Sequence, residues 1–270
     1  MFSAGMKNNK GYKSVSLGVN RRILIVSASV TKEKNAIHGF AEIDISTPRN
    51  IMKSYYKKTG EKLSMTAYIV NCLAKVIKEY PQMNSFIKGR KLIFLDDITI
   101  SVLIEREING EKIPEPVGIK KAQNKTFFQI QEEIREAKKI KNDKLGSLEG
   151  QVWIRFIPNF LLKTIIRFAD KNIGMAKRYG KIAVTAVGMF SKEPIWFIPH
   201  GSGTVLITVG SISNKIAEVD GKFVPREHLC LTASFDHNII DGAPAARFLN
   251  SFIEEIKSGR SLPLETSTVN

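Results

Sequence analysis

The stretch from Leu229 to Ser258 constrains the fold more than any other part of this chain. Its first residues, up to Phe235, are apolar or favour β-structure, and they predict a buried strand. From Ala245 onward the apolar positions recur at helical spacing, which predicts an amphipathic helix with one face in the core. The short polar loop between them therefore lies between two packed elements, where a rigid functional site can be built.

That loop carries the pattern His-x-x-x-Asp-Gly, formed by His237, Asp241 and Gly242. An ordinary imidazole has a pKa near ~6.5, so a neutral His237 can take up a proton at cellular pH and return it. Gly242 permits a turn or a close backbone approach that a Cβ would prevent. A purely structural reading is also open, in which Asp241 caps a helix ahead of Pro244 and His237 is a satisfied histidine at a loop edge.

Three further stretches accompany the segment FDHNIIDGAPAARFLNSFIEEI. They are NAIHGFAEIDIST, EKLSMTAYIVNCLAKVIKEYPQMNSFI and KIAVTAVGMF, which begin at Asn35, Glu61 and Lys181. In this order the four stretches resemble the catalytic domain of the dihydrolipoyl acyltransferase component of 2-oxo acid dehydrogenase complexes. That domain shares its fold and its His-x-x-x-Asp-Gly motif with chloramphenicol acetyltransferase. The resemblance covers most of the chain from about Val15 to Leu264.

The fold that this resemblance implies is α/β (α+β), a chloramphenicol acetyltransferase-like two-layer sandwich whose mixed β-sheet is flanked by helices. We expect a flexible N-terminal arm at 1–14, an acyltransferase catalytic domain at 15–264 and a C-terminal tail at 265–270. Hydrophobic periodicity gives the elements, Ser64 is predicted to cap the second helix, and Asn109-Gly110 and Asp220-Gly221 are predicted turns between strands. The predicted strands are 40–45, 92–94, 98–105, 182–187, 204–209, 215–219, 222–224 and 229–235, and the predicted helices are 47–56, 65–80, 126–141 and 245–256.

The resemblance also implies roles for individual residues. His237 would be the general base, and Thr185, which matches the family's serine, would donate its hydroxyl to a tetrahedral oxyanion. Thr185 and Gly188 would contact coenzyme A. In the family an arginine pairs with the aspartate of the motif and supports the loop, and Arg21 or Arg22 would do so here. Both arginines are equally compatible with ordinary surface charges.

The sequence departs from the family at two positions that flank these residues. Asn238 stands where the family has arginine, and Ala186 stands where it has asparagine. Neither change removes the general base or the hydroxyl donor, but both leave open which molecule accepts the acyl group. In the resembled fold the histidine of one subunit faces the hydroxyl-bearing segment of its neighbour. We therefore expect a homotrimer, able to build a larger cubic assembly, and an inactive monomer.

The function implied is acyl transfer between coenzyme A and a thiol acceptor, with His237 as general base. The cofactors expected are coenzyme A or acyl-CoA as substrate and a lipoyl group on a separate carrier protein, since the chain offers no room for a lipoyl domain. The alternative is a catalytically silent trimeric core or scaffold subunit related to the same complexes. His237→Ala separates the two, because only an enzyme would lose acyl transfer while keeping its oligomeric state.

The chain is strongly basic, with 41 Lys and Arg against 26 Asp and Glu and a net charge of +15. Such a charge suits nucleic acid, an anionic membrane or a polyanionic small molecule such as coenzyme A. Because the charge is scattered and no nucleic-acid-binding motif accompanies it, neither nucleic acid nor membrane is an expected partner. The apolar, basic segment 145–180 is expected to cover a subunit interface.

The remaining signals concern metal and compartment. The four histidines show no metal-ligand spacing, so no metal is expected. Cys72 and Cys230 lie among apolar neighbours, which predicts two buried thiols in a reducing compartment. The first residues lack the apolar core of a signal peptide, and the expected location is cytoplasmic.

Overall fold

The computed structural model describes residues 7–9, 11–14, 17–108, 111–139, 157–188, 191 and 193–263. Its centre is a mixed six-stranded sheet in the order β3-β10-β9-β8-β6-β7. These strands are β3 (Ala36–Asp44), β6 (Ile100–Ile108), β7 (Glu111–Ile119), β8 (Ile182–Ala186), β9 (Val205–Val219) and β10 (Lys222–Asp236). Strand β8 runs parallel to β6 and β9, and the other neighbours are antiparallel. The mixed sheet expected from the resemblance is confirmed.

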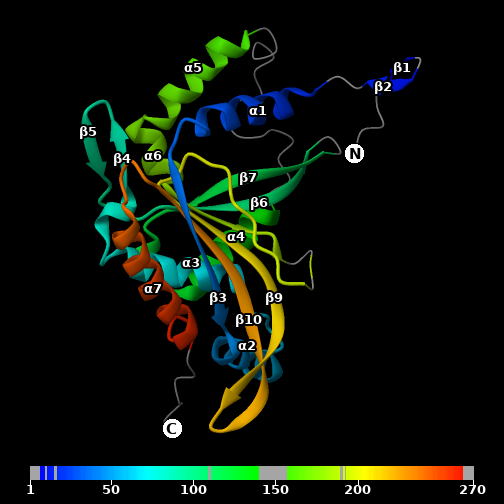
Figure 1. Ribbon diagram of the computed structural model, residues 1–270, viewed down its shortest axis with the longest axis vertical. Coiled ribbons are helices and arrows are strands. Elements are labelled where there is room, and N and C mark those ends of the chain that lie inside the picture. Colours follow the sequence, from blue (N-terminus) through cyan, green and yellow to red (C-terminus); the bar gives the residue numbers. More distant parts are fainter. Residues whose placement is uncertain are drawn as a thin grey trace.

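Helices cover one face of this sheet (Figure 1). They are α2 (Ser46–Thr59), α3 (Met65–Ile77), α4 (Phe127–Lys139) and α7 (Gly242–Ser258). A second group lies at one end of the molecule, where α1 (Val19–Thr31) packs beside α5 (Asn159–Asp170), and α6 (Ile173–Tyr179) follows (Figure 1). The described chain also contains two small hairpins, β1–β2 (Lys7–Asn9 and Tyr12–Ser14) and β4–β5 (Ser85–Lys88 and Lys91–Phe94), and two short 3-10 helices, η1 (Pro81–Asn84) and η2 (Ala122–Asn124).

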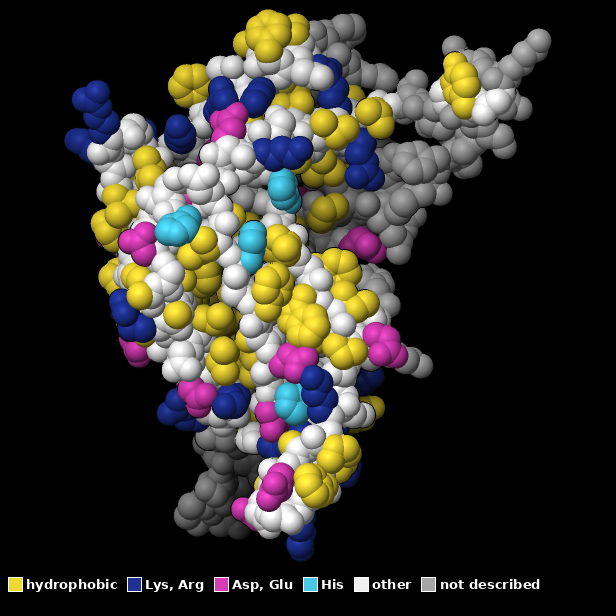
Figure 2. Space-filling view, viewed as in Figure 1, with side chains coloured by type: hydrophobic (Ala, Val, Ile, Leu, Met, Phe, Trp, Pro, Cys, Tyr) yellow, Lys and Arg dark blue, Asp and Glu magenta, His cyan; other side chains and the backbone are white. Residues whose placement is uncertain are grey.

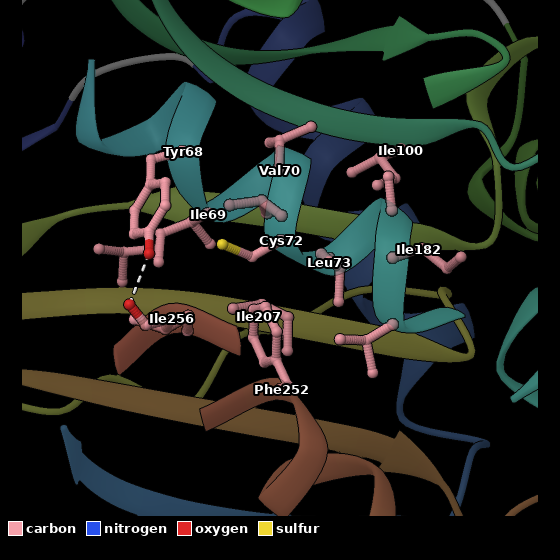
Figure 3. Packing of buried hydrophobic residues seen from close by; sticks show 14 of the residues in the cluster. Tyr68, Ile69, Val70, Cys72, Leu73, Ile100, Ile182, Ile207, Phe252 and Ile256 are labelled. Atoms are coloured by element: carbon pink, nitrogen blue, oxygen red, sulfur yellow. Dashed lines mark hydrogen bonds between the residues drawn. The ribbon is translucent and has the colours of Figure 1, made fainter. Parts of the chain in front are cut away.

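Helix α3 is the centre of the core, because it is apolar on nearly every side. Ser64 is its N-cap and accepts a hydrogen bond from the Ala67 backbone N–H at 3.3 Å, as its sequence position indicates. Figure 3 shows α3 beside α7 over the strands of the sheet, with the Tyr68 hydroxyl pointing to the last turn of α7. That hydroxyl donates to the Ile256 carbonyl at 2.5 Å, which ties the two helices together in the buried interior.

The long hairpin β9–β10 corrects one prediction. The sequence predicted four short strands here, at 204–209, 215–219, 222–224 and 229–235, whereas the structure has two strands of 15 residues. Ser211, between two of the predicted strands, is buried, and the neighbouring loop satisfies its hydroxyl. It donates to the Glu193 carbonyl at 2.6 Å and accepts from the Ile195 N–H at 2.8 Å. A β-bulge between Leu229 and Leu231 accommodates a shift in the register between β9 and β10.

Other sequence signals fall where they were expected. The Asp220-Gly221 turn closes the long hairpin with φ values of 51° and 74°, as a type I′ turn requires. The predicted turn at Asn109-Gly110 lies outside the described residues, although the flanking strands pair at Ile108 and Glu111. The predicted N-terminal arm contains the β1–β2 hairpin. The predicted interface segment contains α5 and α6, and its first part, up to residue 156, lies outside the described residues.

Candidate active site

His237 leaves the sheet immediately after the last residue of β10. Its backbone N–H donates to the Asn35 carbonyl at 2.7 Å, which fixes the chain as it turns away from the sheet. Two further backbone N–H groups, those of Ile239 and Ile240, donate to the Asp236 carbonyl at 3.0 Å and close a tight turn. The His237 side chain remains 44% exposed. The imidazole is therefore held on a rigid turn while staying open to a substrate.

Asp241 stands beside the imidazole, as the spacing of the motif implies. The His237 Nδ1 and Asp241 Oδ1 atoms are 3.5 Å apart, and the aspartate side chain is 84% exposed. Asp241 occupies the N-cap position of α7 but makes no side-chain capping hydrogen bond. The contact thus favours orientation of the ring over helix capping. With Nδ1 turned to the carboxylate, Nε2 is the nitrogen left to accept a proton from a thiol.

Thr185 lies on β8 and faces away from the helices, because its neighbour Val184 is buried in the core. Its cross-strand partner is Thr208 on β9, which pairs in turn with Thr232 on β10. His237 follows five residues after Thr232 and two strands away from Thr185. At ~3.3 Å per residue and ~4.8 Å per strand, Thr185 and His237 of one chain are about 19 Å apart. A single chain therefore does not bring the predicted base and the predicted hydroxyl donor together.

The threonines beside Thr185 are functional candidates that the sequence reasoning missed. Thr208 and Thr232 are buried, and among the described residues their hydroxyl oxygens have no hydrogen-bond partner. A buried hydroxyl without a hydrogen-bond partner is costly, so an internal water is the partner expected for each. The sequence signal was a polar residue at alternate positions of an otherwise apolar strand.

The predicted loop-supporting residues do not meet Asp241 in one chain. The Arg22 guanidinium donates to the Asn159 side-chain oxygen at 2.7 Å and to the Ile157 carbonyl, so it joins α1 to α5. Arg21 is exposed in the first turn of α1. A Cβ added at Gly242 would meet no atom within 4 Å, so neither a tight turn nor a close approach explains this glycine within a single protomer.

Gly188 has a structural reason to be glycine. A Cβ there would lie 1.6 Å from the Gly210 carbonyl oxygen, since the backbones of β9 and the segment after β8 touch. Packing alone therefore forbids a side chain at this position. Contact with coenzyme A remains a prediction for Gly188.

A cluster of four charged side chains lies next to the catalytic turn and was also missed from the sequence. The four residues, Lys34, Asp170, Lys181 and Asp236, come from separate parts of the chain and meet where β10 ends. The signal available was the placement of Asp236 and Lys181 at the ends of predicted strands. Their partners could not be found without the tertiary structure.

The described residues contain no group of three or more His, Cys, Asp or Glu placed to hold a metal ion. Across those same ranges, no helix combines the length and the apolar character needed to cross a bilayer. Cys72 and Cys230 are both free and buried, and burial raises the pKa of each thiol, to about 12 for Cys72. Figure 2 shows Lys and Arg spread over the visible face among Asp and Glu.

The fold, a mixed sheet covered by helices with a histidine leaving a central strand, is shared with solved structures of known proteins. It is similar to the cubic core of a pyruvate dehydrogenase multienzyme complex, with a TM-score of 0.67 and 20% identity over 94% of this chain and 96% of that one. It is equally similar to dihydrolipoamide acetyltransferase of Azotobacter vinelandii, with a TM-score of 0.67 and 20% identity over 94% of each chain. That structure was studied for the role of a serine, a histidine and an asparagine in catalysis.

The chain belongs to the 2-oxoacid dehydrogenases acyltransferase (catalytic domain) family, whose model matches residues 27–151 and 163–263. Among curated relatives, the lipoamide acyltransferase component of the branched-chain alpha-keto acid dehydrogenase complex of Bacillus subtilis is 29% identical over 223 residues. The match covers 80% of this chain and 45% of that protein. The chain thus spans about half the length of the curated relatives it matches.

Proposed function

We propose that this protein transfers an acyl group between coenzyme A and a dihydrolipoyl group on a separate carrier protein. The observation that carries the proposal is the half-exposed His237 imidazole, fixed at the end of β10 with Asp241 on its Nδ1 side. The family supports this proposal, since its curated relatives are named as acyltransferase components of 2-oxo acid dehydrogenase complexes.

The residues support a simple sequence of proton transfers. His237 Nε2 accepts the proton of the attacking thiol, and the thiolate adds to the thioester carbonyl carbon. Thr185 donates its hydroxyl to the oxyanion of the tetrahedral intermediate. When the intermediate collapses, the C–S bond to the leaving thiol breaks and the imidazolium returns the proton to that sulfur. At the end of the reaction the protein has the same protonation state as at the start.

The proposal requires more than one protomer. About 19 Å separates Thr185 from His237 along one sheet, estimated from strand geometry, which is too far for both to contact the same reacting carbon. A neighbouring chain must then supply one of them, and a homotrimer with the site between subunits is the arrangement we propose.

Larger assembly and location extend the same proposal. One structural neighbour is the cubic core of a pyruvate dehydrogenase multienzyme complex, and we propose that trimers of this chain assemble further in a similar way. Two free, buried thiols suit a reducing compartment such as the cytoplasm.

The second candidate is a silent core or scaffold subunit. It is favoured by Ala186 and Asn238, which replace polar residues of the family pattern, and by threonine at position 185 in place of serine. A scaffold would keep the oligomeric state and show no acyl transfer. This makes activity itself the discriminating measurement.

The deciding experiment screens acetyl-, succinyl- and branched-chain acyl-coenzyme A donors against free dihydrolipoamide. His237→Ala is expected to lower kcat by about 100-fold or more, the usual contribution of a general base, with an unchanged mass by light scattering. His228→Ala is the matched control, because it removes a histidine from the middle of the same strand. Full activity in His237→Ala would refute the proposed base, and no activity in the unmodified protein would favour the scaffold.

A further inference from the structure

Four charged side chains form one cluster next to the turn that carries His237. The Lys34 Nζ lies 3.4 Å from Asp236 Oδ2 and 3.9 Å from Asp170 Oδ2. The Lys181 Nζ lies 2.6 Å from Asp170 Oδ1. The four side chains are only 5% to 22% exposed. Two ammonium groups and two carboxylates balance in charge, so each buried ion has an opposite partner.

The cluster reaches the catalytic turn through Asp236. One carboxylate oxygen of Asp236 faces Lys34. The other accepts hydrogen bonds from the Asn238 backbone N–H at 3.1 Å and from its side-chain amide at 2.8 Å. Asn35, the residue after Lys34, accepts the His237 N–H at 2.7 Å. Lys34 and Asn35, just before β3, therefore bind Asp236 and His237, where β10 ends.

Lys34 is itself held from several sides. Its ammonium group donates to the Ser202 carbonyl and faces Asp170, at the end of α5. Burial alone would raise the pKa of Asp170, but the charges of Lys181 and Lys34 and hydrogen bonds from Lys181 and Ser202 outweigh it, and the pKa is lowered. Asp170 is thus a carboxylate between two lysines at neutral pH. Lys181 immediately precedes β8, the strand of Thr185.

We propose that Lys34, held in place by Asp170, is a positioning residue that fixes the turn carrying His237. Lys34 acts through Asp236 and does not touch the reacting atoms. The inference rests on the proposed function, because it assigns a purpose to a rigid His237 turn. It also adds a structural connection to the proposed function. Ion pairs between residues far apart in sequence join the α1–α5 end of the molecule to the turn of the proposed base.

The test compares Lys34→Met, which keeps the aliphatic stem, with Lys32→Met, which removes an exposed charge two residues earlier. Lys34→Met is expected to lower kcat by about 10- to 100-fold, the effect of a small misplacement of a catalytic group, while KM for acyl-coenzyme A changes less than twofold. Lys32→Met should leave both constants unchanged. If Lys34→Met does not fold, Asp170→Asn removes the group that holds Lys34 and is measured in the same way.

A double-mutant cycle shows whether Lys34 acts through Asp236. Asp236→Asn alone should lower kcat, and adding Lys34→Met should lower it by less than a further twofold. Hydrogen–deuterium exchange of residues 236–241 should rise in Lys34→Met and not in Lys32→Met, independently of activity. Multiplicative losses of kcat, a loss confined to KM, or unchanged exchange at the turn would overturn the inference.

His237→Ala, assayed alongside, keeps this inference apart from the proposed function. If His237→Ala is inactive and Lys34→Met is fully active, only the positioning role fails. If His237→Ala stays active, the proposed base fails, and the exchange measurement still decides whether Lys34 holds the turn.

Discussion

Phe248 joins the helix that follows the catalytic motif to the strand that precedes it. Its side chain is fully buried on α7 and contacts three rings. The centroids lie 5.8 Å away for Phe235 at the end of β10, 5.5 Å for Tyr80 and 6.1 Å for Phe252, and the first two pairs are edge-to-face. Removing this ring should therefore damage the packing directly beneath the His237 turn.

The expected cost of Phe248→Ala follows from these contacts. Truncating a buried phenylalanine costs ~3–5 kcal/mol of unfolding free energy, including the cavity left behind. Because three aromatic contacts, each worth ~0.5–1.5 kcal/mol, disappear with the ring, we expect a value near the upper end, ~4–5 kcal/mol. Phe248→Leu, which refills much of the volume, should cost less than Phe248→Ala.

Urea unfolding measures the difference in unfolding free energy between each variant and the unmodified protein. The protein concentration is kept fixed, because oligomerisation makes the midpoint concentration-dependent. Phe223→Ala, at a side chain that is 77% exposed near the hairpin turn, is the control and should change the free energy by less than ~0.5 kcal/mol. A loss of unfolding free energy below ~1 kcal/mol for Phe248→Ala would refute the reasoning, because removing a buried ring with three aromatic contacts should destabilise the fold by more than this.

Two further predictions concern ionisable groups. Because the pKa of Asp170 is lowered, its carboxylate stabilises the folded protein above the unfolded-state value near ~4, and this contribution is lost as pH falls through the lower folded value. Unfolding free energies between pH 3 and pH 6 should therefore drop more steeply for the unmodified protein than for Asp170→Asn, and parallel curves would contradict this. Cys72 and Cys230, with raised pKa values and buried side chains, should react with a thiol reagent at pH 8 only after denaturation. Rapid labelling of the native protein would show that these sites are open.

Local signals in the sequence were sufficient for much of the fold. Ser64 caps α3 as predicted, and Asp220-Gly221 closes a hairpin with the backbone angles that its residues favour. The strand, loop and helix around His237 also followed from periodicity. Such signals succeed because caps, turns and amphipathic faces depend on residues within a few positions of one another.

Features that depend on distant pairing required the tertiary structure. The predicted strands 204–209 and 215–219 are one strand in the structure, and the buried Ser211 hydroxyl between them is hydrogen-bonded to a loop from residues 193–195. Arg22, one of the two arginines proposed to support the Asp241 loop, joins α1 to Asn159 at the start of α5 within this chain.

The sequence by itself determined the class of fold and pointed to His237 as the proposed general base, because both follow from contiguous motifs. The tertiary structure decided what holds that histidine in place and how far it stands from Thr185. Lys34 and Asp236 are separated by about two hundred residues and form an ion pair only because β3 and β10 are neighbours. No local pattern specifies which strands pair, so the surroundings of the site follow from the topology of the sheet.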